Sequence, residues 1–250
     1  MGKDQVKFVE NFYCTILSVG NTKFEDLENL FNFIGSNSRK PLINIDSSVN
    51  TVEFKTLDKF NTGVCMFYRI NGQRSEVDFK DHEELETVPT NSEVSVYDYN
   101  TAIGRLIQQI AHERFFHELR TTEELGYVVY CAVKHILSSE YLVFVVQSEK
   151  SIDFLEQRIL KFVIDLKTHI SEMDSEEFES HKESLIGFYE EPIVNLEDLS
   201  TAITNQLTKG NIDLNYDRKM VEIVKKLTKQ NIGDSDILNE YVRVNSIKHQ

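Results

Sequence analysis

The sequence predicts an α+β domain in which an antiparallel sheet packs against helices. Three observations support this class: strand-like runs in the first part of the chain, a pair of apolar runs near the middle that suits a hairpin, and a mostly helical remainder. Strands followed by helices, without regular β-α-β alternation, are typical of a layered α+β domain. At 250 residues the chain is long enough for one large or two small domains with a proper core.

The first 48 residues predict a strand, a helix and a linker. Residues 9–21 are rich in aromatic and β-branched side chains and end in a Gly-Asn pair, which is typical of a strand stopped by a turn. Residues 24–34 carry apolar side chains at helical spacing and are followed by a glycine. Residues 36–48 combine Ser, Asn and Pro, so we place the domain boundary in this linker.

Two strands and a long helix are expected next. Residues 51–70 hold two strand-like runs around a turn at 61–63, and the polar, acidic residues 71–95 predict a loop. A helix is expected from about Asp98 to Leu119, because the apolar side chains between them recur at i, i+3, i+4 and i+7.

A short turn and a hairpin follow the long helix. Thr121 and Glu124 have capping-box spacing, and Gly126 is placed to close a short helical turn. Residues 127–133 and 141–147 are apolar runs that predict two hairpin strands, both buried on both faces.

The remainder is predicted to be helical. A long amphipathic helix is expected over residues 151–170, and a second helix begins at Asp174 and is interrupted by Pro192. Three further helices are expected over residues 197–209, 217–228 and 234–243.

Composition narrows the class of partner and the compartment. Lys and Arg number 27 against 41 Asp and Glu, and the formal charge of −14 argues against nucleic acid or an anionic membrane as the main partner. Cys14, Cys65 and Cys131 form no CxxC pair, which favours reduced thiols. The sequence shows no apolar run of membrane-spanning length and no signal-like start, so a cytoplasmic protein is expected.

The stretch HERFFH (112–117) comes near a zinc motif without completing it. In HExxH the two histidines are four residues apart and share one helical face. His112 and His117 are five apart and point about 140° away from each other on a regular helix. The inverted motif HxxEH is also absent. We therefore expect no metal site in this chain.

The phrase LRTTEELGY (119–127) carries a family resemblance. Followed by two strands that end in QSEK (147–150), it resembles a segment of the insulysin and pitrilysin family of zinc metallopeptidases, where it reads close to LRTxEQLGY. The resemblance implies that residues 1–48 are the last strand and helix of a preceding domain plus a linker. It also implies that residues 49–250 are the C-terminal domain, which lacks the zinc motif.

The resemblance further implies a role in peptide hydrolysis. In that family two halves close around a peptide, and the zinc lies in the first half. This chain would be inactive alone and would close the chamber, with a zinc-bearing N-terminal half in the same or another chain as its partner and a peptide as its substrate. Arg120 and Tyr127 would bind substrate and stabilise the transition state, and Phe116 would line the cleft. No cofactor is expected in this chain itself.

Other interpretations stay open. From spacing alone, Arg120 would pair with Glu123 or Glu124 on a surface turn, Tyr127 would open a strand and Phe116 would belong to the core. The chain could also be a scaffold or interaction protein of the same fold without a catalytic role, or a self-sufficient hydrolase.

The two ends of the sequence and one residue of the motif depart from the family pattern. Glu124 stands where the family usually has Gln. The chain ends about where the family adds a final strand, so we expect the last sheet to lack an edge, and a strand at 9–19 would lack partners. These features predict a fragment or a chain that needs a partner.

Overall fold

The computed structural model divides the chain into two units. One comprises residues 1–43 and 192–213, and the other residues 44–191 and 214–250. The residues described are 51–55, 60–71, 95–136, 139–208, 213 and 215–247. The strand, helix and linker predicted within residues 1–48 lie outside these ranges. In the first unit the described element is helix α6 (Leu196–Thr208), which matches a predicted helix.

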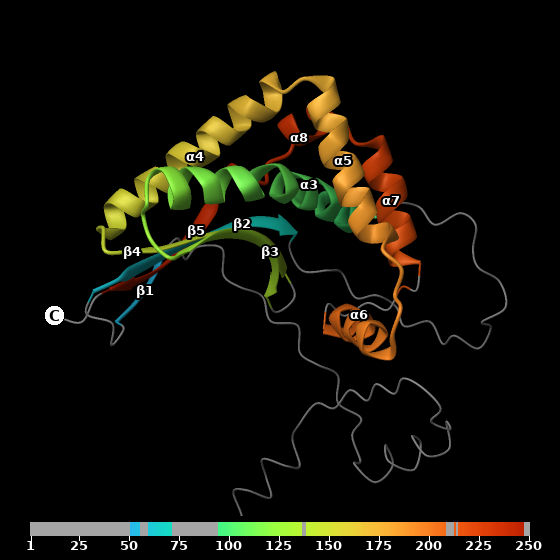
Figure 1. The fold of residues 1–250 in the computed structure, drawn as a ribbon, viewed down its shortest axis with the longest axis horizontal. Helices are drawn as coiled ribbons and strands as arrows, with labels where there is room; N and C mark the ends of the chain where they lie inside the picture. Colours follow the sequence, from blue (N-terminus) through green and yellow to red (C-terminus); the bar gives the residue numbers. More distant parts are fainter. Residues whose placement is uncertain are drawn as a thin grey trace, which may run out of the picture. The chain divides into compact units, whose positions relative to one another are not determined.

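A five-stranded sheet, counted over the described residues, forms the base of the second unit (Figure 1). Its strand order is β1-β5-β2-β4-β3. The strands are β1 (Thr51–Lys55), β2 (Thr62–Asn71), β3 (Val128–Ile136), β4 (Ser139–Ser148) and β5 (Tyr241–Ile247). Neighbouring strands run antiparallel except β1 and β5, which pair in parallel. The predicted α+β class, with a largely antiparallel sheet, is confirmed.

Helices cover one face of this sheet, as Figure 1 shows. They are α3 (Val96–Phe116), α4 (Ile152–Glu172), α5 (Ser175–Glu190), α7 (Tyr216–Lys226) and the short α8 (Lys229–Gly233). Three aromatic rings from α3, β4 and α4 meet at the centre of the core: the Phe115 centroid lies 5.1 Å from that of Phe144 and 4.9 Å from that of Phe162. The helices predicted from apolar spacing in this unit therefore form where that spacing is sustained, with one exception described below.

Side-chain caps set where the long helices begin. The Ser95 hydroxyl accepts a hydrogen bond from the Asp98 amide, and the Ser151 hydroxyl accepts one from the Phe154 amide. The Asp174 carboxylate caps α5 in the same way. Each cap satisfies an amide that has no partner within its helix. The helix that we expected to begin near Asp98 thus begins two residues earlier.

The helix predicted over residues 234–243 is wrong. Strand β5 begins at Tyr241, takes the last three residues of that range, and lies between β1 and β2, where it pairs on both sides. Val242 and Val244 alternate with polar residues in this segment, and sheet pairing on both edges outweighs the weak helical spacing.

The two hairpin strands differ in burial, contrary to the prediction that both are buried on both faces. Strand β4 lies between β2 and β3 and is buried along nearly its whole length. In β3, Val129 and Cys131 are buried but Tyr130 is exposed. Strand β3 is at the edge of the described sheet and has a neighbouring strand on one side only, whereas β4 has one on each side.

Candidate functional site

Helix α3 ends in a π-helical turn, His117–Thr122, which holds most of the predicted site. The Glu123 amide donates to the Glu118 carbonyl at 3.0 Å, a five-residue spacing that defines the turn. Thr121 lies inside this turn and does not cap a new helix, so the predicted capping box is wrong. Turns of this kind are rare, and they occur frequently at functional sites.

The backbone after the π-helical turn is tightly constrained. Glu124 has a φ of 52°, in the left-handed region. A Cβ atom on Gly126 would lie 1.8 Å from the Gln147 carbonyl oxygen of β4. Gly126 is therefore required because two backbones approach closely there, and not as the predicted closure of the turn. The left-handed residue is Glu124 instead.

Arg120 and Tyr127, the two residues singled out from the sequence, lie together. The Arg120 Nη1 donates to the Gly126 carbonyl oxygen at 2.7 Å. The guanidinium carbon lies 4.6 Å from the centroid of the Tyr127 ring, within range of a cation–π interaction. Tyr127 is 90% exposed, so the pair lies at the surface and is open to a ligand.

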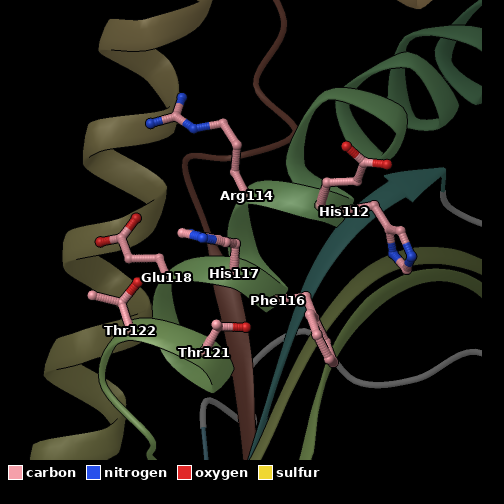
Figure 2. Close-up of a pocket in the computed structure, with 8 residues that line it drawn as sticks. His112, Arg114, Phe116, His117, Glu118, Thr121 and Thr122 are labelled. Atoms are coloured by element: carbon pink, nitrogen blue, oxygen red, sulfur yellow. The ribbon is translucent and has the colours of Figure 1, made fainter.

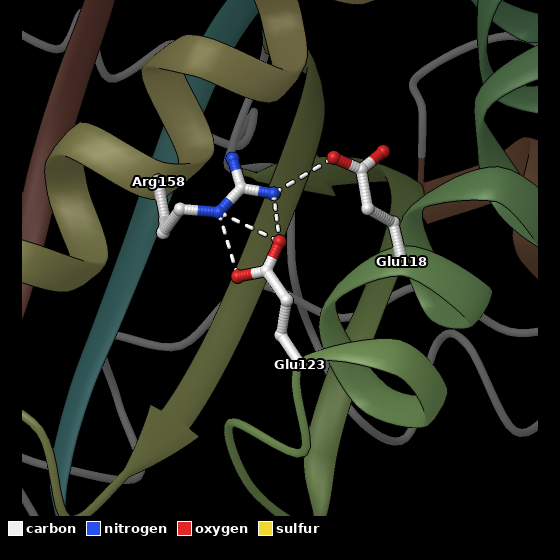
Figure 3. Close-up of polar contacts among 3 residues, drawn as sticks. All are labelled: Glu118, Glu123 and Arg158. Atoms are coloured by element: carbon white, nitrogen blue, oxygen red, sulfur yellow. Dashed lines mark hydrogen bonds and ion pairs between the residues drawn. The ribbon is translucent and has the colours of Figure 1, made fainter.

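The local ion pair that we weighed for Arg120 does not form with Glu123. Figure 3 shows that Glu123 and Glu118 both bind Arg158 of α4. The Arg158 Nε lies 2.9 Å and 2.7 Å from the two Glu123 carboxylate oxygens, and Nη2 lies 2.8 Å from a Glu118 oxygen. Nη2 also donates to Glu123. Hydrogen bonding to Glu123, and then to Glu118, raises the pKa of Arg158 against the opposing effect of burial.

Sequence reasoning missed Arg158. It lies 35 residues from Glu123 and 40 from Glu118, beyond the reach of any local spacing rule. The sequence shows the two acidic residues Glu118 and Glu123, but on a regular helix they would face different sides, so a shared partner was not suggested.

Phe116 is 46% exposed, so the interpretation that it belongs to the core is wrong. It lines an open groove of about 710 Å³ formed by residues between His112 and Thr122 (Figure 2). In Figure 2 the His117 and Arg114 side chains extend toward α4, whereas Phe116 and His112 point away from it. The two histidines therefore diverge and share no metal. Arg120 and Tyr127 do not line this groove. Phe116 is therefore close to the pair in sequence but does not lie in the same site.

The residues present do not fit the zinc of a peptidase. Within the described ranges, no group of three or more His, Cys, Asp or Glu side chains is arranged to hold a metal ion. The sequence also has no HxxEH motif. In the same described part of the chain, none of the helices is both long and apolar enough to cross a membrane.

Fold and site together define a class: an α+β domain with helices on one face of a mixed sheet, which presents an arginine–tyrosine pair and whose sequence has no zinc motif. The family model described as "PQQ synthase PqqF-like, C-terminal lobe domain 4" matches residues 106–204. The putative zinc protease mug138 of Schizosaccharomyces pombe is 36% identical over 149 residues, which cover 59% of this chain and 15% of that protein. The A-factor-processing enzyme of Saccharomyces cerevisiae is 27% identical over 227 residues, which cover 90% of this chain and 21% of that protein.

Solved structures agree on the fold. The crystal structure of pitrilysin superimposes with a TM-score of 0.63 at 17% identity, covering 88% of this chain and 22% of that one. The family model and the relatives, together with the shared fold, support a likeness to the C-terminal domain of the insulysin and pitrilysin family, and the sequence has no zinc motif. It spans about a fifth or less of the length of the curated relatives named above.

Proposed function

We propose that this chain is the non-catalytic C-terminal part of an insulysin-like zinc metalloendopeptidase. It closes the peptide chamber opposite a zinc-bearing N-terminal half, in the same or a separate chain. The observation that supports this most is the stacking of the half-buried Arg120, on the π-helical turn, against the exposed Tyr127 that follows it.

The chemistry of the pair suits peptide hydrolysis. Negative charge develops on the carbonyl oxygen when the peptide bond is attacked, and fixed donors aimed at that oxygen stabilise it without reorganising. A guanidinium has five N–H donors. Among the described residues, Arg120 donates one of them to Gly126, and the rest can reach a ligand. The Tyr127 hydroxyl supplies a second kind of donor, and the exposed Phe116 ring offers apolar contact to substrate side chains.

The catalytic half supplies what this chain lacks. By this proposal zinc and the general base belong to that half, in keeping with the description of one relative as a putative zinc protease. The substrate is a peptide, which agrees with the printed descriptions of the relatives as a zinc protease and a processing enzyme. The free thiols of Cys65 and Cys131 support the proposed location in the reducing cytoplasm.

The proposal is tested by mixing the two halves. We expect the zinc-bearing half of the same organism to hydrolyse peptides only when this chain is added. Arg120→Ala and Tyr127→Phe should each lower kcat/KM by about tenfold, because each removes a donor to the transition state. Arg218→Ala, which removes an exposed arginine of α7, is the matched control and should leave the rate unchanged.

Two other outcomes would redirect the assignment. Association of the halves without any gain in hydrolysis would contradict the proposal and favour a scaffold of the same fold. Hydrolysis by this chain alone would instead favour a self-sufficient enzyme.

A further inference from the structure

Two glutamates mark the two ends of the π hydrogen bond, and one arginine binds both. The bond itself runs from the Glu123 amide to the Glu118 carbonyl. The side chains of these same two residues converge on Arg158, which is only 13% exposed (Figure 3). The bridge therefore joins α4 to the turn at the residues that define its geometry.

Such a bridge depends on the π geometry. Residues five apart point about 140° away from each other on an α-helix, so one guanidinium could not hold both carboxylates. In a π-helical turn the i→i+5 hydrogen bond brings residues five apart to successive positions on one side. Bridging by Arg158 thus favours the π-helical turn over the α-helical alternative.

We propose that Arg158 is a positioning residue, which holds the π-helical turn so that Arg120 and Tyr127 face the substrate. This inference rests on the proposed function, because it assigns a role to the pair only in peptide binding. Arg120 lies in the turn between the two glutamates, so any rewinding of the turn rotates its side chain. Its contact with the Gly126 carbonyl then transmits the change to Tyr127.

Arg158 also keeps the nearby carboxylates from Arg120. The sequence offers Glu123 as a local partner for Arg120, three residues away. In the structure Nε and Nη2 of Arg158 together hold both oxygens of Glu123, in the side-by-side geometry that a guanidinium forms with a carboxylate. Removal of Arg158 frees Glu123 to draw Arg120 off the Tyr127 ring.

The test measures the turn directly in the whole chain by amide hydrogen exchange. Arg158→Ala should make exchange over residues 117–127 about tenfold faster, because a charge-assisted contact that closes the turn is lost. Arg158→Lys keeps the positive charge but loses the planar pair of N–H donors, so it should give an intermediate exchange rate. Arg243→Ala is the matched control, since it breaks a similarly buried arginine contact, to Glu156 of α4, away from the turn.

A fluorescent reporter provides the second measurement. The chain has no tryptophan, so Tyr127→Trp places a single tryptophan, which can be excited selectively over tyrosine, beside Arg120. Added to this background, Arg158→Ala should lower the residual fluorescence anisotropy, whereas Arg243→Ala should leave it unchanged. Unchanged exchange and anisotropy in Arg158→Ala, or equal changes in Arg243→Ala, would overturn the proposal.

Activity then separates this inference from the proposed function. With the zinc-bearing half present, Arg158→Ala should lower kcat/KM, and combining it with Tyr127→Phe should cost less than the product of the two single losses. Faster exchange over residues 117–127 without any effect of Arg120→Ala on hydrolysis would contradict the role of the pair. Loss of hydrolysis in Arg120→Ala with unchanged exchange in Arg158→Ala would contradict the positioning role alone.

Discussion

At the scale of single residues, Gly126 makes the most specific demand. A Cβ atom there would overlap the Gln147 carbonyl oxygen, and the backbone of β4 cannot move aside as a flexible side chain can. Gly126→Ala should therefore lower the free energy of unfolding by about 2–4 kcal/mol. The measurement is chemical denaturation followed by circular dichroism.

Gly187→Ala is the matched control for this prediction. Gly187 lies inside α5, where an added Cβ meets nothing within 4 Å. Alanine should raise the free energy of unfolding there by about 0.5–1 kcal/mol, because it loses less backbone entropy on folding. Equal effects at the two glycines would contradict the steric account of Gly126.

The site was only partly predictable at this scale. Arg120 and Tyr127 could be named from the motif, and the structure brings them together. Their anchor Arg158 could not be named, because its contacts span a long stretch of sequence. The left-handed Glu124 was missed as well, since a glycine two residues later seemed the natural place for such a conformation.

At the scale of elements, the aromatic cluster joins two helices to the sheet. The Phe162 ring of α4 is fully buried against Phe115 and Phe144. Phe162→Ala should lower the free energy of unfolding by about 3–5 kcal/mol, because it removes apolar contacts and leaves a cavity. Ile164→Ala, on the same helix but 63% exposed, should change it by less than about 0.5 kcal/mol. Comparable losses of unfolding free energy in both variants would show that the buried face of α4 is assigned wrongly.

Helices and strands were predictable where the spacing of apolar residues stayed regular over a long stretch. Helix α4 repeats its apolar spacing over five turns or so and formed as predicted. Strand β5 is short, and its pairing partners are far away in the sequence, so local pattern gave the wrong answer. The π-helical turn escaped prediction because the arginine that binds its two glutamates lies on α4, far away in the sequence.

At the scale of the whole molecule, pH should act on stability through His169. Burial, and then the nearby Arg114 charge, lowers the pKa of this histidine below its ordinary value of 6.5, while Glu177 opposes the shift. The unfolded chain therefore binds more protons than the folded one between the lowered pKa and 6.5, and stability rises with pH across that window. At pH values below the lowered pKa, the stability that the unprotonated His169 contributes is lost.

The check is a series of thermal melting curves at pH values across that window. His169→Gln should flatten the dependence of Tm on pH, because the substituted side chain does not titrate. A slope that stays unchanged in the variant would assign the effect to other groups.

The position of β5 governs how the molecule reaches its native state. The Gly63 amide on β2 bonds to the Ser246 hydroxyl, 183 residues away in the sequence, and Glu53 on β1 meets Asn245 at a separation of 192. Closing such long loops costs entropy before any contact compensates for it, so pairing of this kind is slow. The β3–β4 hairpin and the helices can form early from local contacts. During synthesis, β1 must wait for β5 to leave the ribosome, and until then β1 and the outer edge of β2 lack the strand that pairs with them and are open to unintended pairing with other chains.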